Sequence, residues 1–243
     1  MEKINKMIII DSRADKENSS GKKKKKPIKL QLALDDIILG EAIEILYTLA
    51  DKVDIIEVGT PMIMKNGMIA VQEIRKCFPD HEILADMKIM DAGFLEAQLA
   101  FEAGADIVTV LGAACNDTIV AAKDAALKYN GKIMIDMIAV EELAMRATSL
   151  DSLQTDYLCV HTAFDRQQTG QNPLEELIVL KGIVKNAGIA VAGGINSNSL
   201  DRILRQEPDI VVVGGGIMEH PDRRKSAENM KEMMRREQHH GEG

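Results

Sequence analysis

The sequence has no tryptophan and few other aromatic residues, with three tyrosines and four phenylalanines among 243 residues. The hydrophobic core therefore has to be built from aliphatic side chains and from the 14 methionines. Layers of branched aliphatic side chains are typical of the interior of a parallel barrel. Six methionines within or beside the strand patterns are expected in the core: Met62, Met64, Met87, Met90, Met134 and Met137.

Cysteine is also scarce, and Cys77, Cys115 and Cys159 are widely spaced without a C-x-x-C pair. This pattern argues against a disulfide framework and against a cysteine-rich metal site, and it fits a reducing compartment. Cys115 follows a predicted strand and has no histidine near it in sequence, so a small buried residue is expected there. The protein is expected in the cytoplasm.

Long apolar runs and an excess of positive charge are missing as well. The opening run of residues 7–10 is too short for a signal sequence, and no run approaches the ~18 residues of a membrane span. The formal net charge of −8 argues against binding driven by a cationic surface. We therefore expect neither a nucleic acid nor a membrane as partner.

One basic run departs from this acidic balance. Residues 22–26 are five consecutive lysines inside a polar stretch. A polyanion tether is one interpretation, but a solvated linker is the commoner one. The sequence predicts a loosely attached leader over 1–27, a catalytic domain over 28–237 and a polar tail over 238–243.

Within the domain, short aliphatic runs alternate with helical patterns eight times. The predicted strands are 28–35, 54–60, 82–88, 106–112, 132–138, 157–162, 189–194 and 209–214. The predicted helices include 40–52, 65–78, 94–103, 117–129, 173–186, 199–206 and 221–236. This rhythm predicts an α/β fold, a single-domain (β/α)8 TIM barrel. A doubly wound open sheet is the alternative, but the turn after the first strand lacks its G-x-G-x-x-G pattern.

Charged side chains gather at the predicted strand ends, where barrel enzymes carry their active sites. Asp35 ends the first strand, Glu57 lies in the second and Asp136 in the fifth. The third strand carries Asp86 and Lys88, which a period of two places on one face. A single acid of this kind is often a helix cap or part of a structural ion pair. Together they predict a site in which carboxylates bind a divalent metal or act as bases and Asp136 contacts substrate.

The last two strands end in glycine clusters. Gly193 and Gly194 follow the seventh strand, and Gly215 and Gly216 follow the eighth. Glycines there allow backbone N–H groups to close around a phosphate, although tight turns alone would also use them. His161 ends the sixth strand, where it either forms a structural hydrogen bond or moves a proton.

The segment from Asp86 through Lys88 to Asp91 resembles the D-x-K-x-x-D signature of the orotidine-phosphate decarboxylase superfamily. Residues 28–236 resemble its 3-hexulose-6-phosphate synthase branch. Six further segments match that branch in order: 32–35 (LALD), 57–61 (EVGTP), 159–162 (CVHT), 170–174 (GQNPL), 191–195 (VAGGI) and 213–217 (VGGGI).

The resemblance implies a magnesium-dependent aldol condensation of formaldehyde with D-ribulose 5-phosphate through an enediolate. It implies Glu57 and Asp86 as Mg²⁺ ligands, with Asp35 and Lys88 beside the substrate oxygens. It also implies that Asp91 reaches into the neighbouring subunit's site, so that the active form is a homodimer with shared sites. The base that removes the C1 proton stays open between His161 and a carboxylate.

Two other activities and one non-catalytic role are the alternatives to this condensation. The 3-keto-L-gulonate-6-phosphate decarboxylases of the superfamily carry an arginine three residues after the histidine, where this chain has Phe164. Orotidine-phosphate decarboxylase itself has a lysine at the position of Glu57 and works without a metal. A non-catalytic sugar-phosphate-binding relative would have no need of the complete set of acids and lysine.

Overall fold

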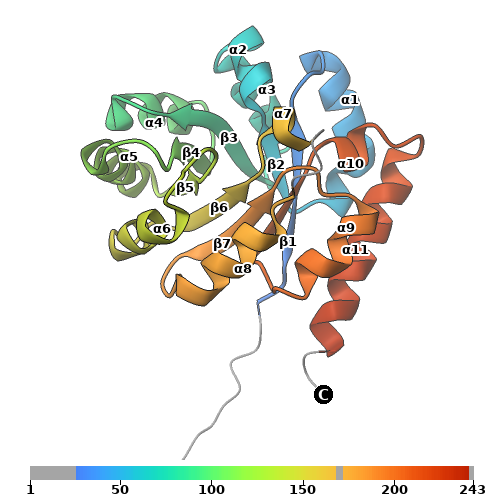
Figure 1. The fold of residues 1–243 in the computed structure, drawn as a ribbon. Helices are drawn as coiled ribbons and strands as arrows, with labels where there is room; N and C mark the ends of the chain where they lie inside the picture. The colour runs from blue at the N-terminus through green and yellow to red at the C-terminus, as the bar shows by residue number, and fades with distance from the viewer. Residues whose placement is uncertain (1–25, 168–171, 241–243) are drawn as a thin grey trace, which may run out of the picture.

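Eight parallel strands pair in sequence order and close into a barrel (Figure 1). The computed structural model describes residues 26–167 and 172–240. The strands are β1 (Lys29–Leu34), β2 (Ile55–Val58), β3 (Glu82–Ile89), β4 (Ile107–Leu111), β5 (Lys132–Asp136), β6 (Tyr157–His161), β7 (Gly188–Ala192) and β8 (Ile210–Val213). Pairing of β1 with β8 closes the ring. The predicted single-domain (β/α)8 TIM barrel is confirmed.

Helices surround the barrel and cover its outer face (Figure 1). They are α1 (Leu39–Leu49), α2 (Thr60–Asn66), α3 (Ile69–Cys77), α4 (Gly93–Glu102), α5 (Asn116–Tyr129), α6 (Leu143–Ser152), α7 (Phe164–Gln167), α8 (Leu174–Ile183), α9 (Ser197–Leu204), α10 (Gly215–Met218) and α11 (Arg223–His240), with a 3-10 turn, η1, at Ala50–Lys52. The short helix α7 lies over the end of the barrel that is at the top of Figure 1.

Most element boundaries lie within a few residues of the sequence prediction, and two differences change the elements around α2. The second strand ends at Val58 rather than at residue 60, because Thr60 and Pro61 already begin α2. The single helix predicted over 65–78 is two helices, α2 and α3. Gly67 lies between them with a φ of 61°, a left-handed conformation that a helix interior does not accept.

The alternation of side chains along each strand builds two apolar layers. One set packs outward against the helices and includes Leu32, Leu34 and Ile56, all fully buried. The other set points into the barrel: Ala33, Ile55, Leu84, Ile107, Met134, Cys159, Ala190, Ala192, Ile210 and Val212. Each fully buried Leu or Ile stabilises the fold by about 1.5–3 kcal/mol relative to an exposed one.

Three residues expected in the interior lie at the surface instead. Met64 is 81% exposed and Met90 is 52% exposed, whereas Met62, Met134 and Met137 are buried as expected. Met64 belongs to the outer side of α2, and Met90 comes just after β3 has ended, so neither side chain lies on a strand. Cys115 is also exposed, because it precedes α5 in a surface loop, and its expected burial was wrong.

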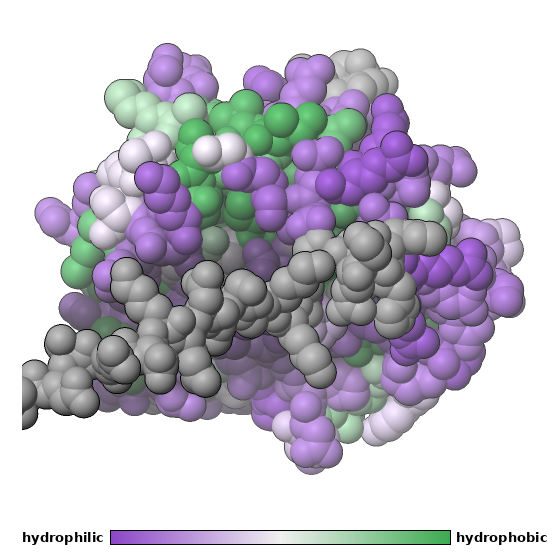
Figure 2. All heavy atoms as spheres, turned by 90° about the horizontal axis from the view of Figure 1, so that it is seen from below, coloured by the Kyte–Doolittle hydropathy of each residue, from purple (hydrophilic) through white to green (hydrophobic). Residues whose placement is uncertain are grey.

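The face at the N-terminal ends of the strands is mostly hydrophilic (Figure 2). Here Glu82 of β3 forms ion pairs with Lys29 of β1 and with Lys132 of β5. One hydrophobic area lies along the upper edge of Figure 2, on the flank where Figure 1 draws α8, whose Ile178 and Val179 are partly exposed. The predicted leader, apart from residues 26 and 27, lies outside the described residues. Among the described helices, none is both long and apolar enough to cross a bilayer.

Candidate active site

The polar side chains at the mouth follow directly from the register of the inner layer. Two residues beyond an inward apolar side chain, the next inward side chain lies closer to the C-terminal end of the strand. By this step Ile55 leads to Glu57, Leu84 to Asp86, Ile107 to Thr109, Met134 to Asp136 and Cys159 to His161. The barrel therefore carries an apolar floor with a ring of polar groups above it.

Lys88 lies between two carboxylates of this ring. Its Nζ is 2.6 Å from Oδ2 of Asp86 and 3.2 Å from Oδ2 of Asp136. Burial alone would lower the pKa of Lys88, but the charges of the two carboxylates outweigh burial and raise the pKa above its ordinary value. Lys88 is therefore a fixed positive charge at neutral pH.

His161 shares one of these carboxylates. Its Nδ1 is 2.9 Å from Oδ2 of Asp136, while the other oxygen of Asp136 accepts a hydrogen bond from the backbone N–H of Ile138. Burial pushes the pKa of Asp136 upward, but the hydrogen bond with His161 and the charge of Lys88 bring the pKa below its usual value. An ionised Asp136 holds the proton of the imidazole on Nδ1, which leaves Nε2 free to accept another.

Glu57 is a further buried acid of the ring. Burial, followed by the charges of Asp86 and Asp35, raises the pKa of Glu57 to about 8. Its carboxylate accepts a hydrogen bond of 2.6 Å from Nε2 of Gln31, one inward step below on β1. The Oε1 atom of Gln31 is buried and has no hydrogen-bond partner within the described residues.

Asp35 directly follows β1 and is exposed. Partial burial, followed by the charge of Asp86, raises the pKa of Asp35. Gly59 makes room for this carboxylate, since a Cβ there would lie 2.1 Å from Oδ1 of Asp35. The glycine that follows Glu57 by two residues is therefore part of the site.

Asp86 is oriented by two hydroxyl groups that the sequence did not single out. Thr60 donates to Oδ2 of Asp86 over 2.7 Å, and Thr109 donates to Oδ1 over 2.8 Å. Gln31 lies two inward steps before Asp35, so counting by two from that acid would have identified it, whereas β4 ends in no acid from which Thr109 could be reached.

The acids of this ring fit a divalent cation. The carboxyl of Glu57 is buried, and few positive groups nearby compensate its negative charge. The charge of Asp86 is close enough to raise the pKa of Glu57 further. Oxygen ligands suit Mg²⁺, which protein sites often hold with only one or two carboxylates plus substrate and water. In the part of the chain that the structure describes, no group of three or more His, Cys, Asp and Glu side chains is placed to hold a metal ion. Glu57 and Asp86 are therefore the residues that would hold such an ion, with its other positions left to substrate and water.

The glycine loops after β7 and β8 meet beside this ring. Gly193 and Gly194 have φ values of 105° and 65°, which L residues rarely adopt. A Cβ on Gly216 would lie 2.4 Å from the carbonyl oxygen of Ile195, so the two loops pack directly against each other. The following helix α9 begins with Asn196, whose side chain accepts the N–H groups of Asn198 and Ser199. These loops offer glycine backbone at the place predicted for a phosphate group.

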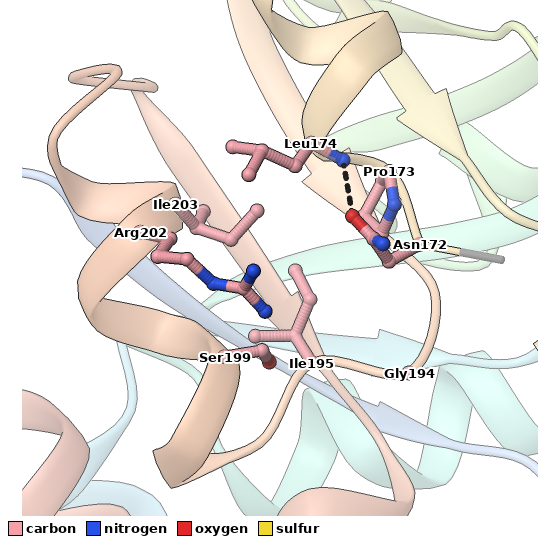
Figure 3. Close-up of a pocket in the computed structure, with 8 residues that line it drawn as sticks. All are labelled: Asn172, Pro173, Leu174, Gly194, Ile195, Ser199, Arg202 and Ile203. Carbon is pink, nitrogen blue, oxygen red and sulfur yellow. Dashed lines mark hydrogen bonds between the residues drawn. The ribbon is translucent and has the colours of Figure 1, made fainter. Parts of the chain in front are cut away.

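A crevice lies on the outer side of the β7 loop (Figure 3). It is lined by residues of α8 and α9 and by Gly194, and the guanidinium group of Arg202 points into it. Its volume is about 20 Å³, which is room for roughly one water molecule. A sugar phosphate cannot enter it. A wider hollow lies between the loops after β4 and β5 and is bordered by Gly112 and Arg146.

The described structure brings together Asp35, Glu57, Asp86, Lys88, Asp136 and His161, all predicted from sequence. Asp91 lies apart from this ring. It is exposed beyond the end of β3, and its carboxylate accepts a hydrogen bond from the backbone N–H of Ala92.

A family model described as "Orotidine 5'-phosphate decarboxylase / HUMPS family" matches residues 28–230. The chain belongs to this family. A 3-hexulose-6-phosphate synthase of Bacillus subtilis is 46% identical over 207 residues, which cover 85% of this chain and 99% of that protein.

Solved structures of the orotidine 5'-phosphate decarboxylase / HUMPS family share the fold. A 3-hexulose-6-phosphate synthase from Salmonella typhimurium is 40% identical with a TM-score of 0.85, over 86% of this chain and 100% of that one. A 3-keto-L-gulonate-6-phosphate decarboxylase from Vibrio cholerae is 28% identical with a TM-score of 0.78, over 87% of this chain and 99% of that one. Within the family, the chain is thus more similar to the synthases than to this decarboxylase.

Proposed function

We propose that this chain condenses formaldehyde with D-ribulose 5-phosphate to give D-arabino-3-hexulose 6-phosphate. The observation that carries the proposal is the position of Lys88, hydrogen bonded to Asp86 and facing Asp136, in a chain so similar to proteins named 3-hexulose-6-phosphate synthase. A fixed positive charge at the mouth of a barrel is suited to an intermediate that develops negative charge on oxygen.

Substrate binding is divided between the two sides of the mouth. The backbone N–H groups around Gly193, Gly194, Gly215 and Gly216 bind the phosphate. This places the ketone end of the pentulose over the acid ring, where Asp35 and Asp136 accept hydrogen bonds from its hydroxyl groups. Glu57 and Asp86 would hold Mg²⁺, which would supply positive charge to polarise the ketone oxygen.

The reaction begins with removal of a proton from C1. Nε2 of His161 accepts this proton, and the electron pair of the C–H bond forms the C1–C2 double bond of an enediolate. Lys88 stabilises the negative oxygen of that enediolate through its fixed charge. C1 then forms a bond to the formaldehyde carbon, and the new alkoxide takes a proton from the imidazolium of His161.

We propose that the active form is a homodimer in which Asp91 completes the partner's site. Asp91 is exposed and lies outside its own chain's ring of acids. Apolar side chains are exposed on α2 and α4, which both contact β3, and in the loop between β3 and α4: Met64, Leu95, Leu99 and Met90. Burial of such side chains against a second copy provides the driving force for association.

The test is an assay of purified protein with D-ribulose 5-phosphate, formaldehyde and Mg²⁺. We expect loss of formaldehyde that depends on the pentulose phosphate and formation of a hexulose phosphate. A parallel assay offers 3-keto-L-gulonate 6-phosphate and measures release of CO₂. If the folded, metal-supplied protein leaves formaldehyde unchanged, the proposed condensation is wrong.

A further inference from the structure

Strand β3 is irregular at the point where it carries the site. Ala85 pairs with Val108 of β4, and the next pair joins Ile89 with Val110. Four residue steps of β3 therefore span only two steps of β4. Within this bulge Lys88 has a φ of 48°, a left-handed conformation that a side chain with a Cβ disfavours.

Thr109 of β4 lies opposite this bulge and is only 4% exposed. Its hydroxyl oxygen accepts the backbone N–H of Lys88 over 2.9 Å. The same hydroxyl donates its single hydrogen to Oδ1 of Asp86 over 2.8 Å. One side chain therefore holds both the backbone of Lys88 and the carboxylate of Asp86.

We propose that Thr109 is a positioning residue that keeps β3 bulged and so places Lys88 against Asp86 and Asp136. In a regular strand, residues two apart are separated by about 6.6 Å along the strand, and their side chains run side by side. In this bulged strand, where Lys88 has a left-handed backbone, its ammonium group reaches Oδ2 of Asp86 at 2.6 Å. Without the hydroxyl group, the amide of Lys88 loses its acceptor and the left-handed conformation loses its support.

The catalytic part of this inference rests on the proposed function. The role of Thr109 in holding the backbone of Lys88 does not depend on which reaction the protein catalyses. The test compares Thr109→Val, which keeps the shape but removes the hydroxyl group, with Thr109→Ser, which keeps the hydroxyl group. Thr155→Val is the matched control, because Thr155 is equally buried but its hydroxyl group donates to the backbone of Leu150 before β6, away from the mouth. Thr109→Ala removes the same hydroxyl group with less bulk and replaces Thr109→Val if that variant does not fold.

Three measurements are made on each full-length variant. Hydrogen–deuterium exchange reports the protection of the Lys88 amide. Exchange of the C1 hydrogen of D-ribulose 5-phosphate with D₂O, in the absence of formaldehyde, reports the proton-transfer step alone. Steady-state kinetics separates kcat from KM. We expect Thr109→Val to expose the Lys88 amide and to lower kcat and C1 exchange by about 10- to 100-fold, as loss of an outer-shell partner does. KM for the pentulose phosphate should change little, and Thr109→Ser should recover most of both rates.

Two results would overturn the inference: wild-type kcat and C1 exchange in Thr109→Val, or losses no larger than those of Thr155→Val. A third result would contradict the proposed reaction without contradicting the role of Thr109. If the wild-type protein neither consumes formaldehyde nor exchanges the C1 hydrogen, the proposed reaction fails. Faster exchange of the Lys88 amide in Thr109→Val would then still support the role of Thr109 in holding the bulge.

Discussion

The Nδ1 atom of His161 and the Nζ atom of Lys88 approach the same oxygen of Asp136, at 2.9 and 3.2 Å. Asp136 is nearly fully buried, and the two nitrogens lie at the ends of different strands. A single carboxylate thus fixes both the tautomer of the proposed base and the position of the proposed cation. Its removal should affect two parts of the reaction at once.

We therefore expect Asp136→Asn to lower kcat by on the order of 100-fold, because an amide neither compensates Lys88 nor holds the proton of His161 on Nδ1. Steady-state kinetics of the condensation measures the loss. Asp151→Asn is the matched control, since Asp151 is also buried and accepts backbone N–H groups of residues 185–187 far from the mouth. The control should lower the melting temperature and leave kcat near that of the wild type. Equal kcat values in the two variants would contradict the role of Asp136.

The raised pKa of Glu57 predicts how metal binding depends on pH. In the metal-free protein this carboxyl, with a pKa of about 8, carries a proton at neutral pH that a bound cation must displace. Release of one proton means that Mg²⁺ affinity rises by about tenfold per pH unit below pH 8 and levels off above it. Calorimetry in two buffers of different ionisation enthalpy counts the released proton. Glu57→Gln should abolish the pH dependence together with most of the affinity, and pH-independent binding by the wild type would rule out Glu57 as a ligand.

The raised pKa of Glu57 also predicts how the stability of the metal-free protein depends on pH. A carboxyl whose pKa rises from 4.5 in the unfolded chain to about 8 in the folded one stabilises the fold fully below pH 4.5. That contribution is lost as the pH rises from 4.5 to about 8, because in this range the unfolded chain ionises the carboxyl while the folded protein still holds its proton. Glu57→Gln should flatten this part of the curve of unfolding free energy against pH. Chemical denaturation in the presence of a chelator measures it.

Gly59 is expected to be intolerant of even a methyl group. A Cβ there would lie 2.1 Å from Oδ1 of Asp35 and 2.7 Å from the carbonyl oxygen of Leu34, so Gly59→Ala must displace the end of β1. We expect a loss of stability of about 1–3 kcal/mol and a larger fractional loss of kcat. Gly40→Ala serves as the control, because a Cβ at this position would have no atom within 4 Å and the residue lies in the first turn of α1. Wild-type activity in Gly59→Ala would show that the position of Asp35 is unimportant.

Asp91 allows a direct test of the shared site. If Asp91 serves the partner's site, Asp91→Ala and Lys88→Ala are each nearly inactive as homodimers. In a mixed dimer one site carries both defects and the other carries neither. Random exchange of subunits makes about half of the dimers mixed, so recovery has a ceiling of about a quarter of wild-type activity. Verified exchange without recovery would mean that Asp91 serves the site of its own chain.

Several features of the site follow from local pattern, and others do not. The acids Asp35, Glu57 and Asp136 were predicted because each lies in or at the end of a short aliphatic run, and the strand ends of a parallel barrel carry its active site. The break between α2 and α3 was missed although Asn66-Gly67 is a common turn pair. Met64 and Met90 were misplaced because hydropathy does not distinguish a core residue from an apolar residue on a surface.

The sequence by itself determined the alternation of strands and helices, and with it the barrel and the edge at which the charged residues gather. It did so because side-chain periodicity and chain connectivity are local properties, and parallel strands joined by helices have few ways to close. Only the tertiary structure decided which groups touch. The contact of Lys88 with Asp86 depends on a bulge held by Thr109, and Gln31 lies beneath Glu57 because of the register between β1 and β2. Such contacts depend on the register and the irregularities between neighbouring strands, which the spacing of residues along one strand does not determine.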